Sequence, residues 1–379
     1  MHRVAWLFEY PTLHGGERSL LAAAPHLQAA GFELVALAPD SGPLAERLAQ
    51  AGAAVVPFEM FDATGQRLSQ EPLRERLAKT VAALRPTLLH ANSLAMGRLA
   101  GPVAAALKLP SLTHLRDIIK LSRAAVADLN RHARLLAVSH ATREFHIAQG
   151  MDAPKVEVLY NGVDLAAFRP RRATGWLHAR LNIPPGAMLI GAVGQLVLRK
   201  GHDVLARAAA RLARQLPEAH WLLIGSRYSQ KAEAVAYEQS LHETFAAADL
   251  GGRAHFLGTV DGVAELLPEL TLLVHPSRQE PLGRVLLEAA ACGVACIATD
   301  VGGTREIFPP ASGAARLVPV DNDEALATAV AELVALPDER ARLGQAARVR
   351  AETQFDICRA AEGLARHYRD VATQASNRA

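Results

Sequence analysis

The sequence predicts an α/β protein of two doubly wound domains, each a parallel β-sheet with helices on both faces. Short runs rich in Val, Ile and Leu alternate with amphipathic stretches along nearly all of the chain, and this alternation is typical of parallel sheets. With 379 residues, the chain exceeds the roughly 250–300 residues at which one hydrophobic core stops growing. Half of the residues are hydrophobic and only 5% are aromatic, as in a globular protein rich in Ala, Leu and Val.

The strand candidates fall into two sets. Those of the first half are Arg3–Phe8, Phe32–Ala38, Ala53–Pro57, Thr87–His90, Ser111–His114, Arg134–Ser139 and Val156–Tyr160. Those of the second half are Met188–Val193, His220–Ile224, Ala254–Leu257, Leu272–His275, Ala295–Ala298 and Arg316–Val318. Open parallel sheets bind ligands beyond the carboxyl ends of their strands, so the residues that follow these strands are candidates for a functional site.

The domain boundary is expected near residue 168. An Asn161-Gly162 turn precedes a proline and a basic run there, which is composition typical of a linker. We therefore expect a first domain over 1–168 and a second over 169–350. Residues 351–379 are expected to form a terminal helix that packs across the domain seam and crosses back to the first domain.

Charge and hydropathy argue against several partners. The net charge of +3 is too small for a dedicated nucleic-acid-binding protein. The first apolar run ends at Glu9 and is too short for a signal peptide, and no run reaches the roughly 18 apolar residues that cross a bilayer. We therefore expect a cytoplasmic protein. Segment 116–143 is rich in Arg and Lys, which indicates either a solvated helix face or peripheral contact with anionic lipid at the inner face of a membrane.

Neither a disulfide framework nor a metal site is expected. Cys292, Cys296 and Cys358 are too few for a disulfide framework, and the first two lack the further ligands of a zinc site. The acidic run 321–323 directly precedes a helical stretch, where such side chains cap the helix. We expect reduced thiols and no bound metal.

Two glutamates, Glu280 and Glu288, lie eight positions apart within the run Ser277–Ala289. Pro281 and Gly283 favour a turn followed by a helix start, so Glu280 belongs to the turn and Glu288 lies one to two helical turns further on. The free backbone N–H groups of a helix start attract phosphate oxygens. A carboxylate at each end of such a site suits a sugar phosphate, whereas an isolated pair with this spacing is usually just solvated.

Polar or small residues also follow three other strands. Gly15 and Gly16 open a helix after the first strand, where glycine allows a phosphate to approach the backbone or simply begins the helix. Arg199 and Lys200 follow the first strand of the second domain, where they either neutralise a leaving phosphate or are ordinary surface cations. His114 ends a strand and is expected to face the ligand side, although a lone histidine there is often structural.

Taken in order, these positions resemble the retaining glycosyltransferases of family 4, which have the GT-B architecture of two Rossmann-like domains facing across a cleft. The resemblance spans nearly the whole chain. It is carried by Gly15-Gly16, Val138-Ser139, Asn161-Gly162-Val163-Asp164, Gly194 to Gly201, Gly258, Pro276-Ser277, Glu280 to Ala289 and Gly302-Gly303 to Glu306.

The resemblance implies that a nucleotide sugar binds mainly to the second domain and the acceptor mainly to the first. It implies a catalytic role for His114, Lys200 and Glu280. The donor-binding residues that it implies are Gly15, Gly16, Gln195, Arg199, Lys200, Glu280, Leu282, Gly283, Arg284 and Glu288.

Within this set the resemblance implies that Glu288 holds the ribose hydroxyls, Glu280 contacts the sugar and Lys200 binds the diphosphate. One position departs from the family pattern, because Gln195 stands where an arginine is often found. Arg199 or Arg284 could supply that charge. The Gly302-Gly303 turn either offers backbone N–H groups to an anion or only makes a tight turn.

The resemblance implies a metal-independent, retaining glycosyltransferase without a cofactor. We expect it to move a hexose or N-acetylhexosamine from a nucleoside diphosphate sugar, with a UDP-sugar expected first, to a hydroxyl acceptor in a glycan, glycolipid or small molecule of cell-envelope or secondary metabolism. The sequence assigns no particular acceptor. Two alternatives stay open, a nucleotide-sugar epimerase and a non-catalytic nucleotide-sugar sensor, the latter because of Gln195.

Overall fold

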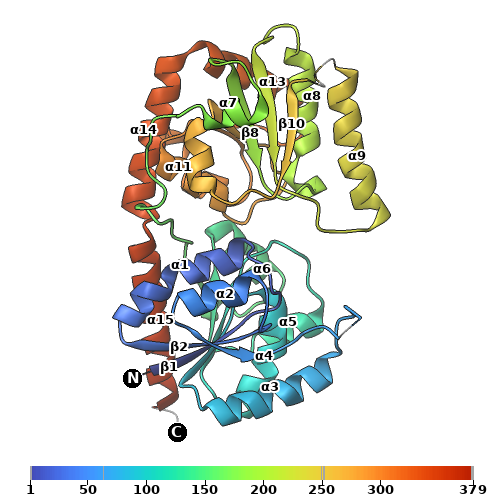
Figure 1. The fold of residues 1–379 in the computed structure, drawn as a ribbon. Helices are drawn as coiled ribbons and strands as arrows, with labels where there is room; N and C mark the ends of the chain where they lie inside the picture. Colours follow the sequence, from blue (N-terminus) through green and yellow to red (C-terminus); the bar gives the residue numbers. More distant parts are fainter. Residues whose placement is uncertain (1, 63, 249, 251, 377–379) are drawn as a thin grey trace. The chain divides into compact units, whose positions relative to one another are not determined.

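The computed structural model describes residues 2–62, 64–248, 250 and 252–376 (Figure 1). The chain divides into two compact units. Unit 1 comprises the described part of residues 1–162 together with 356–379, and unit 2 comprises that of residues 163–355.

Unit 1 contains a seven-stranded parallel sheet in the order β3-β2-β1-β4-β5-β6-β7. Its strands are β1 (His2–Leu7), β2 (Phe32–Ala38), β3 (Ala54–Pro57), β4 (Leu88–Ala91), β5 (Ser111–Leu115), β6 (Arg134–Ala137) and β7 (Val156–Val158). Its helices, with η marking 3-10 helices, are α1 (Gly15–Ala29), α2 (Pro43–Gln50), α3 (Gln70–Leu84), α4 (Leu94–Ala106), α5 (Arg123–Leu129), α6 (His140–Ala148), η1 (Ala153–Lys155) and α15 (Ile357–Ser376).

The two faces of this sheet are buried in separate clusters, as the alternation along β1 shows. Val4 and Trp6 pack with residues of α1 and α15, whereas Ala5 and Leu7 pack with residues of α3 and α4. Successive side chains of a strand point to opposite faces, so a strand buried on both sides reads as a continuous apolar run. The C-terminal helix α15 thus belongs to the core of unit 1, although it is the last element of the chain.

Unit 2 contains a six-stranded parallel sheet in the order β10-β9-β8-β11-β12-β13. Its strands are β8 (Met188–Val193), β9 (Ala219–Ile224), β10 (Ala254–Gly258), β11 (Leu272–His275), β12 (Cys296–Thr299) and β13 (Arg316–Val318). Its helices are α7 (Trp176–Leu181), η2 (Leu198–Lys200), α8 (His202–Leu212), α9 (Ala232–Ala247), α10 (Val263–Leu266), η3 (Leu267–Glu269), α11 (Arg284–Cys292), α12 (Thr304–Ile307), η4 (Pro310–Ser312), α13 (Asp323–Ala335) and α14 (Pro337–Gln354).

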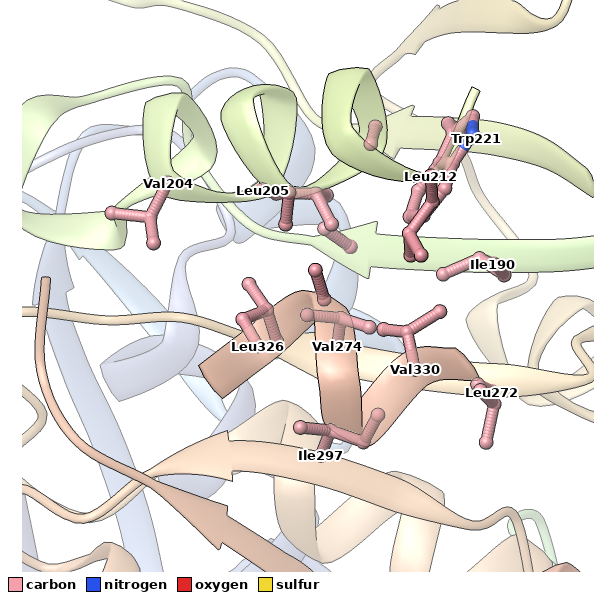
Figure 2. Close-up of a cluster of buried hydrophobic side chains, with 14 of the residues drawn as sticks. Ile190, Val204, Leu205, Leu212, Trp221, Leu272, Val274, Ile297, Leu326 and Val330 are labelled. Atoms are coloured by element: carbon pink, nitrogen blue, oxygen red, sulfur yellow. The ribbon is translucent and has the colours of Figure 1, made fainter. Parts of the chain in front are cut away.

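One face of the unit 2 sheet is covered by α8 and α13, as Figure 2 shows. Leu205 and Leu212 of α8 pack with Val330 of α13 over Ile190 of β8 and Val274 of β11. These aliphatic side chains are almost fully buried, so they fix α8 against β8. The loop that joins β8 to α8 carries Lys200, and its two ends are therefore anchored in the core.

The two doubly wound α/β domains predicted from sequence are confirmed. Each strand candidate corresponds to a strand of the structure, with ends that agree within one or two residues, and every strand pair within the sheets is parallel. In both sheets the first strand of the unit lies beside the fourth. The strand order reverses at this point, and doubly wound sheets bind ligands there.

The boundaries differ from those expected. Residues 163–168 belong to unit 2 and not to the first domain, and the Val163 N–H donates to the Phe355 carbonyl of the same unit at 2.8 Å. The expected terminal helix over 351–379 is also divided. Residues 351–354 end α14, and α15 begins at Ile357 after Asp356, whose side chain accepts the Cys358 N–H at 2.9 Å. This side-chain bond caps a new helix.

The basic segment 116–143 is distributed over a loop, α5, β6 and the start of α6, so it does not form one helix face. Arg134 of this segment forms an ion pair with Glu157, and Arg143 Nε donates to the Val156 carbonyl at 2.9 Å. Membrane contact through this segment stays a prediction. Within the described residues, no helix is long and apolar enough to cross a membrane.

Candidate active site

The main candidate site lies at the carboxyl edge of the unit 2 sheet, where β8 and β11 are neighbours although β9 and β10 come between them in the chain. Lys200 lies in the loop after β8, and Glu280 lies in the turn after β11. Each residue was predicted from its own motif. The structure brings them together, with Lys200 Nζ 2.5 Å from Glu280 Oε2.

One carboxylate oxygen of Glu280 receives all the hydrogen bonds found for this side chain. Besides Lys200, His275 Nε2 lies 2.6 Å and Ser277 Oγ 3.4 Å from Oε2. Among the described residues Oε1 has no hydrogen-bond partner. It is also absent from the fully buried atoms that lack a partner, so solvent reaches it. Glu280 is 5% exposed. Lys200, His275 and Ser277 therefore all contact one oxygen of Glu280, and the other has no partner among the described residues.

The surroundings of Glu280 keep it ionised. Burial would raise the pKa of Glu280, but the charge of Lys200 and the hydrogen bond from His275 outweigh burial and hold this pKa well below its usual range. Burial and the charge of Lys200 both lower the pKa of His275, so His275 is neutral at pH 7 and donates its Nε2–H. An ammonium group has three donors, and Lys200 Nζ uses one of them among the described residues.

Close backbone contacts fix the two loops at this distance. Gly201 has a φ of +67°, and a Cβ there would lie 1.9 Å from the Pro276 carbonyl oxygen, so only glycine fits. Gly303 donates its N–H to the Glu280 carbonyl at 2.9 Å, and a Cβ on Gly302 would lie 2.1 Å from the same oxygen. These contacts show that the Gly302-Gly303 turn supports the Glu280 turn, whereas anion binding by its backbone N–H groups stays a prediction.

Arg278 joins the same two loops through its side chain and its backbone. Its Nη1 and Nη2 bind the two carboxylate oxygens of Asp203 at 2.8 and 2.6 Å, and Nη1 also donates to the Leu198 carbonyl at 2.7 Å. The Arg278 N–H donates to the Arg199 carbonyl at 2.8 Å. Burial would raise the pKa of Asp203, but the Arg278 guanidinium lowers it strongly. Arg278 therefore positions the loop that carries Lys200.

Glu288 lies in the second turn of α11, as predicted from the spacing. Gly283 precedes α11 with a φ of +107°, and Leu282 beside it is buried. Arg284 Nε donates to Glu288 Oε1 at 2.6 Å. The prediction that Arg284 supplies charge to a diphosphate would thus require its guanidinium to leave or share this ion pair.

Gln195 and Arg199 lie near Lys200 with their side chains uncommitted within the described residues. Gln195 accepts the Val197 N–H through its backbone carbonyl, but no hydrogen bond of its side-chain amide is found there. The guanidinium of Arg199 is exposed and has no hydrogen-bond partner among those residues. Arg199 is therefore the more available of the two arginines considered for a diphosphate contact.

In unit 1, Gly15 and Gly16 form the first turn of α1, which follows β1 at the point where β1 and β4 are neighbours. A Cβ on Gly16 would lie 3.0 Å from Arg116 Cδ. Arg116 is held by Asn92, whose Oδ1 accepts from Nε and Nη2 at 3.2 and 2.9 Å, and by Asn161 at 2.8 Å. The absence of a side chain at Gly16 thus leaves room for the side chain of Arg116 beside the start of α1.

His114 is the penultimate residue of β5 and is 3% exposed. Its Nδ1 lies 2.7 Å from Nε2 of His90, the penultimate residue of β4. Burial, followed by the charge of Arg116, lowers the pKa of both histidines well below the usual range, so both are neutral at pH 7. The sequence prediction named His114 alone, and the structure shows it as one member of a buried pair.

His90 and His275 were missed, although a signal for both was present. Each is the last or next-to-last residue of a buried strand at the point where the strand order reverses, and a polar residue there is unusual in a strand that is otherwise apolar. Arg116 follows β5 in the same way. Asp203 and Arg278 had no such signal, because their pairing depends on how two loops approach each other.

No cluster of His, Cys, Asp or Glu that could hold a metal is found among the described residues. In the acidic run 321–323, Asn322 caps α13 by accepting the Ala325 N–H at 2.8 Å, as predicted. Cys292 and Cys296 are buried and Cys358 is exposed, all three as free thiols. Burial raises the pKa of the Cys292 thiol to about 12.

Comparison with known proteins assigns the chain to a family. Residues 13–167 match the family model described as Glycosyltransferase Family 4, and residues 177–350 match the model described as glycosyl transferases group 1. The chain is 32% identical over 363 residues to a GDP-mannose-dependent alpha-mannosyltransferase of Mycobacterium tuberculosis, over 89% of this chain and 88% of that protein. The chain belongs to glycosyltransferase family 4.

Two further similarities agree with this assignment. The family 4 chain is 30% identical over 254 residues to a lipopolysaccharide core biosynthesis mannosyltransferase of Rhizobium leguminosarum, over 67% of this chain and 66% of that protein. Its fold matches the crystal structure of Anabaena HepE in complex with UDP and glucose with a TM-score of 0.86 at 23% identity, over 97% of this chain and 99% of that one. The protein is therefore a glycosyltransferase with the GT-B fold.

Proposed function

We propose that unit 2 binds a nucleoside diphosphate sugar at the carboxyl ends of β8 and β11, and that the protein transfers the sugar to a hydroxyl acceptor with retention. The observation that carries this proposal is the arrangement at Glu280. A buried, ionised carboxylate has one oxygen without a partner among the described residues, and the ammonium group 2.5 Å from its other oxygen has further N–H donors. The carboxylate suits sugar hydroxyls, and the cation suits a diphosphate.

We propose GDP-mannose as the donor, in place of the UDP-sugar expected from sequence. The similarity that supports GDP-mannose is the 32% identity, over 89% of the chain, to a protein named as GDP-mannose-dependent. A second relative is named as a mannosyltransferase. GDP-mannose carries mannose in the α configuration, so an α-linked product corresponds to retention.

In the proposed reaction the acceptor hydroxyl attacks the anomeric carbon on the face from which the diphosphate leaves. The bond from that carbon to the diphosphate oxygen breaks, a bond to the acceptor oxygen forms, and the acceptor proton passes to the departing diphosphate. Lys200 and Arg199 stabilise the charge that develops on the diphosphate. Glu288 binds the ribose hydroxyls, Glu280 orients the sugar, and no metal is required.

A thermal-shift screen with GDP-mannose, UDP-glucose, UDP-N-acetylglucosamine and ADP-glucose tests the donor, because a ligand that binds the native state raises its apparent stability. We expect the largest shift with GDP-mannose. A larger shift with either uridine sugar would restore the first expectation, and no shift with any donor would contradict the proposed site. The screen is run with and without EDTA to test whether binding needs a metal.

Proton NMR of the incubated donor separates the transferase from its two alternatives. A transferase consumes GDP-mannose faster when an acceptor is added, and the new anomeric signal has the α configuration. An epimerase changes the sugar signals of the donor without an acceptor, and a sensor leaves the donor unchanged. A β-configured product would contradict retention.

A further inference from the structure

Four buried polar side chains of unit 1 form a continuous hydrogen-bonded chain that ends at His114. Trp6 Nε1 lies 2.9 Å from Tyr368 Oη, Tyr368 Oη lies 2.6 Å from His90 Nδ1, and His90 Nε2 lies 2.7 Å from His114 Nδ1. The residues come from β1, α15, β4 and β5, and none is more than 3% exposed. Tyr368 and His90 are 278 positions apart in the sequence.

We infer that Tyr368 and His90 hold His114 in a single tautomer, with its proton on Nε2, so that His114 presents a hydrogen-bond donor and not a base to a substrate oxygen. Tyr368 and His90 are thus positioning residues that act through His114. The inference rests on the proposed function for the identity of the substrate, whose hydroxyl oxygen accepts the bond.

The chemistry of the four groups fixes the direction of the chain. Both histidines are neutral at pH 7 because burial and the nearby Arg116 lower their pKa values, and a neutral imidazole has one N–H. The indole of Trp6 can only donate, so it occupies one lone pair of Tyr368 Oη. The hydroxyl of Tyr368 must then donate its own hydrogen to an acceptor.

The hydroxyl hydrogen of Tyr368 finds its acceptor at His90 Nδ1, because these are the only two hydrogen-bond partners of Tyr368 Oη among the described residues. His90 must then carry its proton on Nε2 and donate it to His114 Nδ1. In the reverse direction the Tyr368 hydroxyl would accept two hydrogen bonds and leave its own hydrogen without an acceptor in the core. An unsatisfied buried donor is the costlier arrangement.

Because His114 Nδ1 accepts the hydrogen bond from His90, the single proton of the neutral His114 ring lies on Nε2. This atom has no hydrogen-bond partner among the described residues. It is also absent from the fully buried atoms that lack a partner, so it is in contact with solvent. His114 is 3% exposed, and the part of the ring that solvent reaches includes Nε2. A ligand oxygen that approaches there meets an N–H group, held by the last helix of the chain.

The tautomer is tested directly by two-bond ¹H–¹⁵N NMR on protein with ¹⁵N-labelled histidine at pH 7, with His114→Asn used to assign the signals. We expect a protonated Nε2 and an unprotonated Nδ1 for His114 in the wild type. In Tyr368→Phe, His90 Nδ1 loses the hydroxyl it accepts from, and His114 should become a mixture of tautomers. A protonated Nδ1 in the wild type, or an unchanged tautomer in Tyr368→Phe, would overturn the inference.

Trp6→Phe is the matched control from the same chain of contacts. It removes more buried volume than Tyr368→Phe but leaves the tyrosine hydroxyl with its acceptor, so the His114 tautomer should be kept. Because only part of His114 then carries its proton on Nε2, kcat of Tyr368→Phe should fall about two- to tenfold, at most the effect of one hydrogen bond, with little change in KM and a smaller loss in Trp6→Phe. The opposite order of the two variants would indicate a packing role and contradict the inference.

The two proposals fail separately. If the wild type transfers no sugar but shows the expected tautomer, the proposed function fails and the chain of hydrogen bonds stands. If it transfers sugar with a protonated Nδ1 on His114, the function stands and the present inference fails.

Discussion

The ion pair between Lys200 and Glu280 should show a large coupling energy in a double-mutant cycle. The charged atoms are 2.5 Å apart, so their attraction at an effective dielectric constant of about 20 is about 7 kcal/mol. The two side chains are only 14% and 7% exposed, and the desolvation of both charges offsets most of that attraction. Removing one partner leaves the other buried without its counter-charge, which costs about 3–5 kcal/mol for a buried pair.

The cycle compares Lys200→Met, Glu280→Gln and the double variant. We expect a loss of about 3 kcal/mol for Lys200→Met, because the buried carboxylate keeps only His275 and Ser277. Glu280→Gln should cost about 1–2 kcal/mol, since the ammonium of Lys200 can turn towards water. The double variant should cost about 2 kcal/mol, so the coupling energy is about 2–3 kcal/mol.

The assay is urea unfolding followed by tryptophan fluorescence in a Trp6→Phe background. The remaining tryptophans, Trp176 and Trp221, both lie in unit 2, so the signal reports the unit that holds the pair. The more exposed pair of Glu339 and Arg342 on α14 is the control and should show a coupling energy below about 1 kcal/mol. Additive losses at Lys200 and Glu280, within about 0.5 kcal/mol, would refute the reasoning.

Three further predictions concern the supports of the site and the buried histidines. Gly201→Ala should destabilise unit 2 by about 3 kcal/mol, because its Cβ would overlap the Pro276 carbonyl. The control Gly186→Ala has a φ of +90° but open space around it, so it should cost only about 1 kcal/mol. Equal losses in urea unfolding would contradict this prediction. Arg278→Met should lower the free energy of unfolding by about 2 kcal/mol and raise KM for the donor more than it lowers kcat, since it frees the loop of Lys200; an unchanged KM would count against a positioning role. Burial lowers the pKa of His132 from 6.5 to about 4, so as pH falls this residue is protonated in the unfolded chain before it is protonated in the folded one. Between pH 7 and 5 His132 alone should therefore lower the free energy of unfolding by about 2 kcal/mol. His132→Asn should show a shallower dependence of stability on pH, and identical slopes would contradict the assignment.

The fold could be predicted because its signals are local. Apolar runs such as Phe32–Ala38 and Met188–Val193 are bounded by turn residues, and both match strands of the structure. Pro281 and Gly283 placed Glu280 in a turn and Glu288 in a helix, as the structure shows. The rule that ligands lie beyond the carboxyl ends of parallel strands then selected Lys200 and Glu280, which the structure brings together; that a ligand binds there stays a prediction.

What the sequence could not supply depends on contacts between distant segments. From the sequence, Tyr368 is only one apolar position of a C-terminal helix. Its contacts with Trp6 and His90 could not be predicted, because they require α15 to pack beside β1 and β4. The ion pair of Arg284 with Glu288 could have been predicted from their spacing of four residues on a helix, whereas that of Lys200 with Glu280 required the two loops to be brought together by Gly201. The division between α14 and α15 rests on one side-chain bond from Asp356, a weak signal within a long helical pattern.

The central claim is that Glu288 marks the nucleotide end and Glu280 the sugar end of one donor site in unit 2. Isothermal titration of GDP and of GDP-mannose into the wild type, Glu280→Gln and Glu288→Gln tests it most directly. We predict that Glu288→Gln weakens both ligands by about tenfold or more, the effect of a hydrogen bond to a charged group, and that Glu280→Gln weakens only GDP-mannose. Equal weakening of both ligands by Glu280→Gln, or no effect of either variant, would contradict the account.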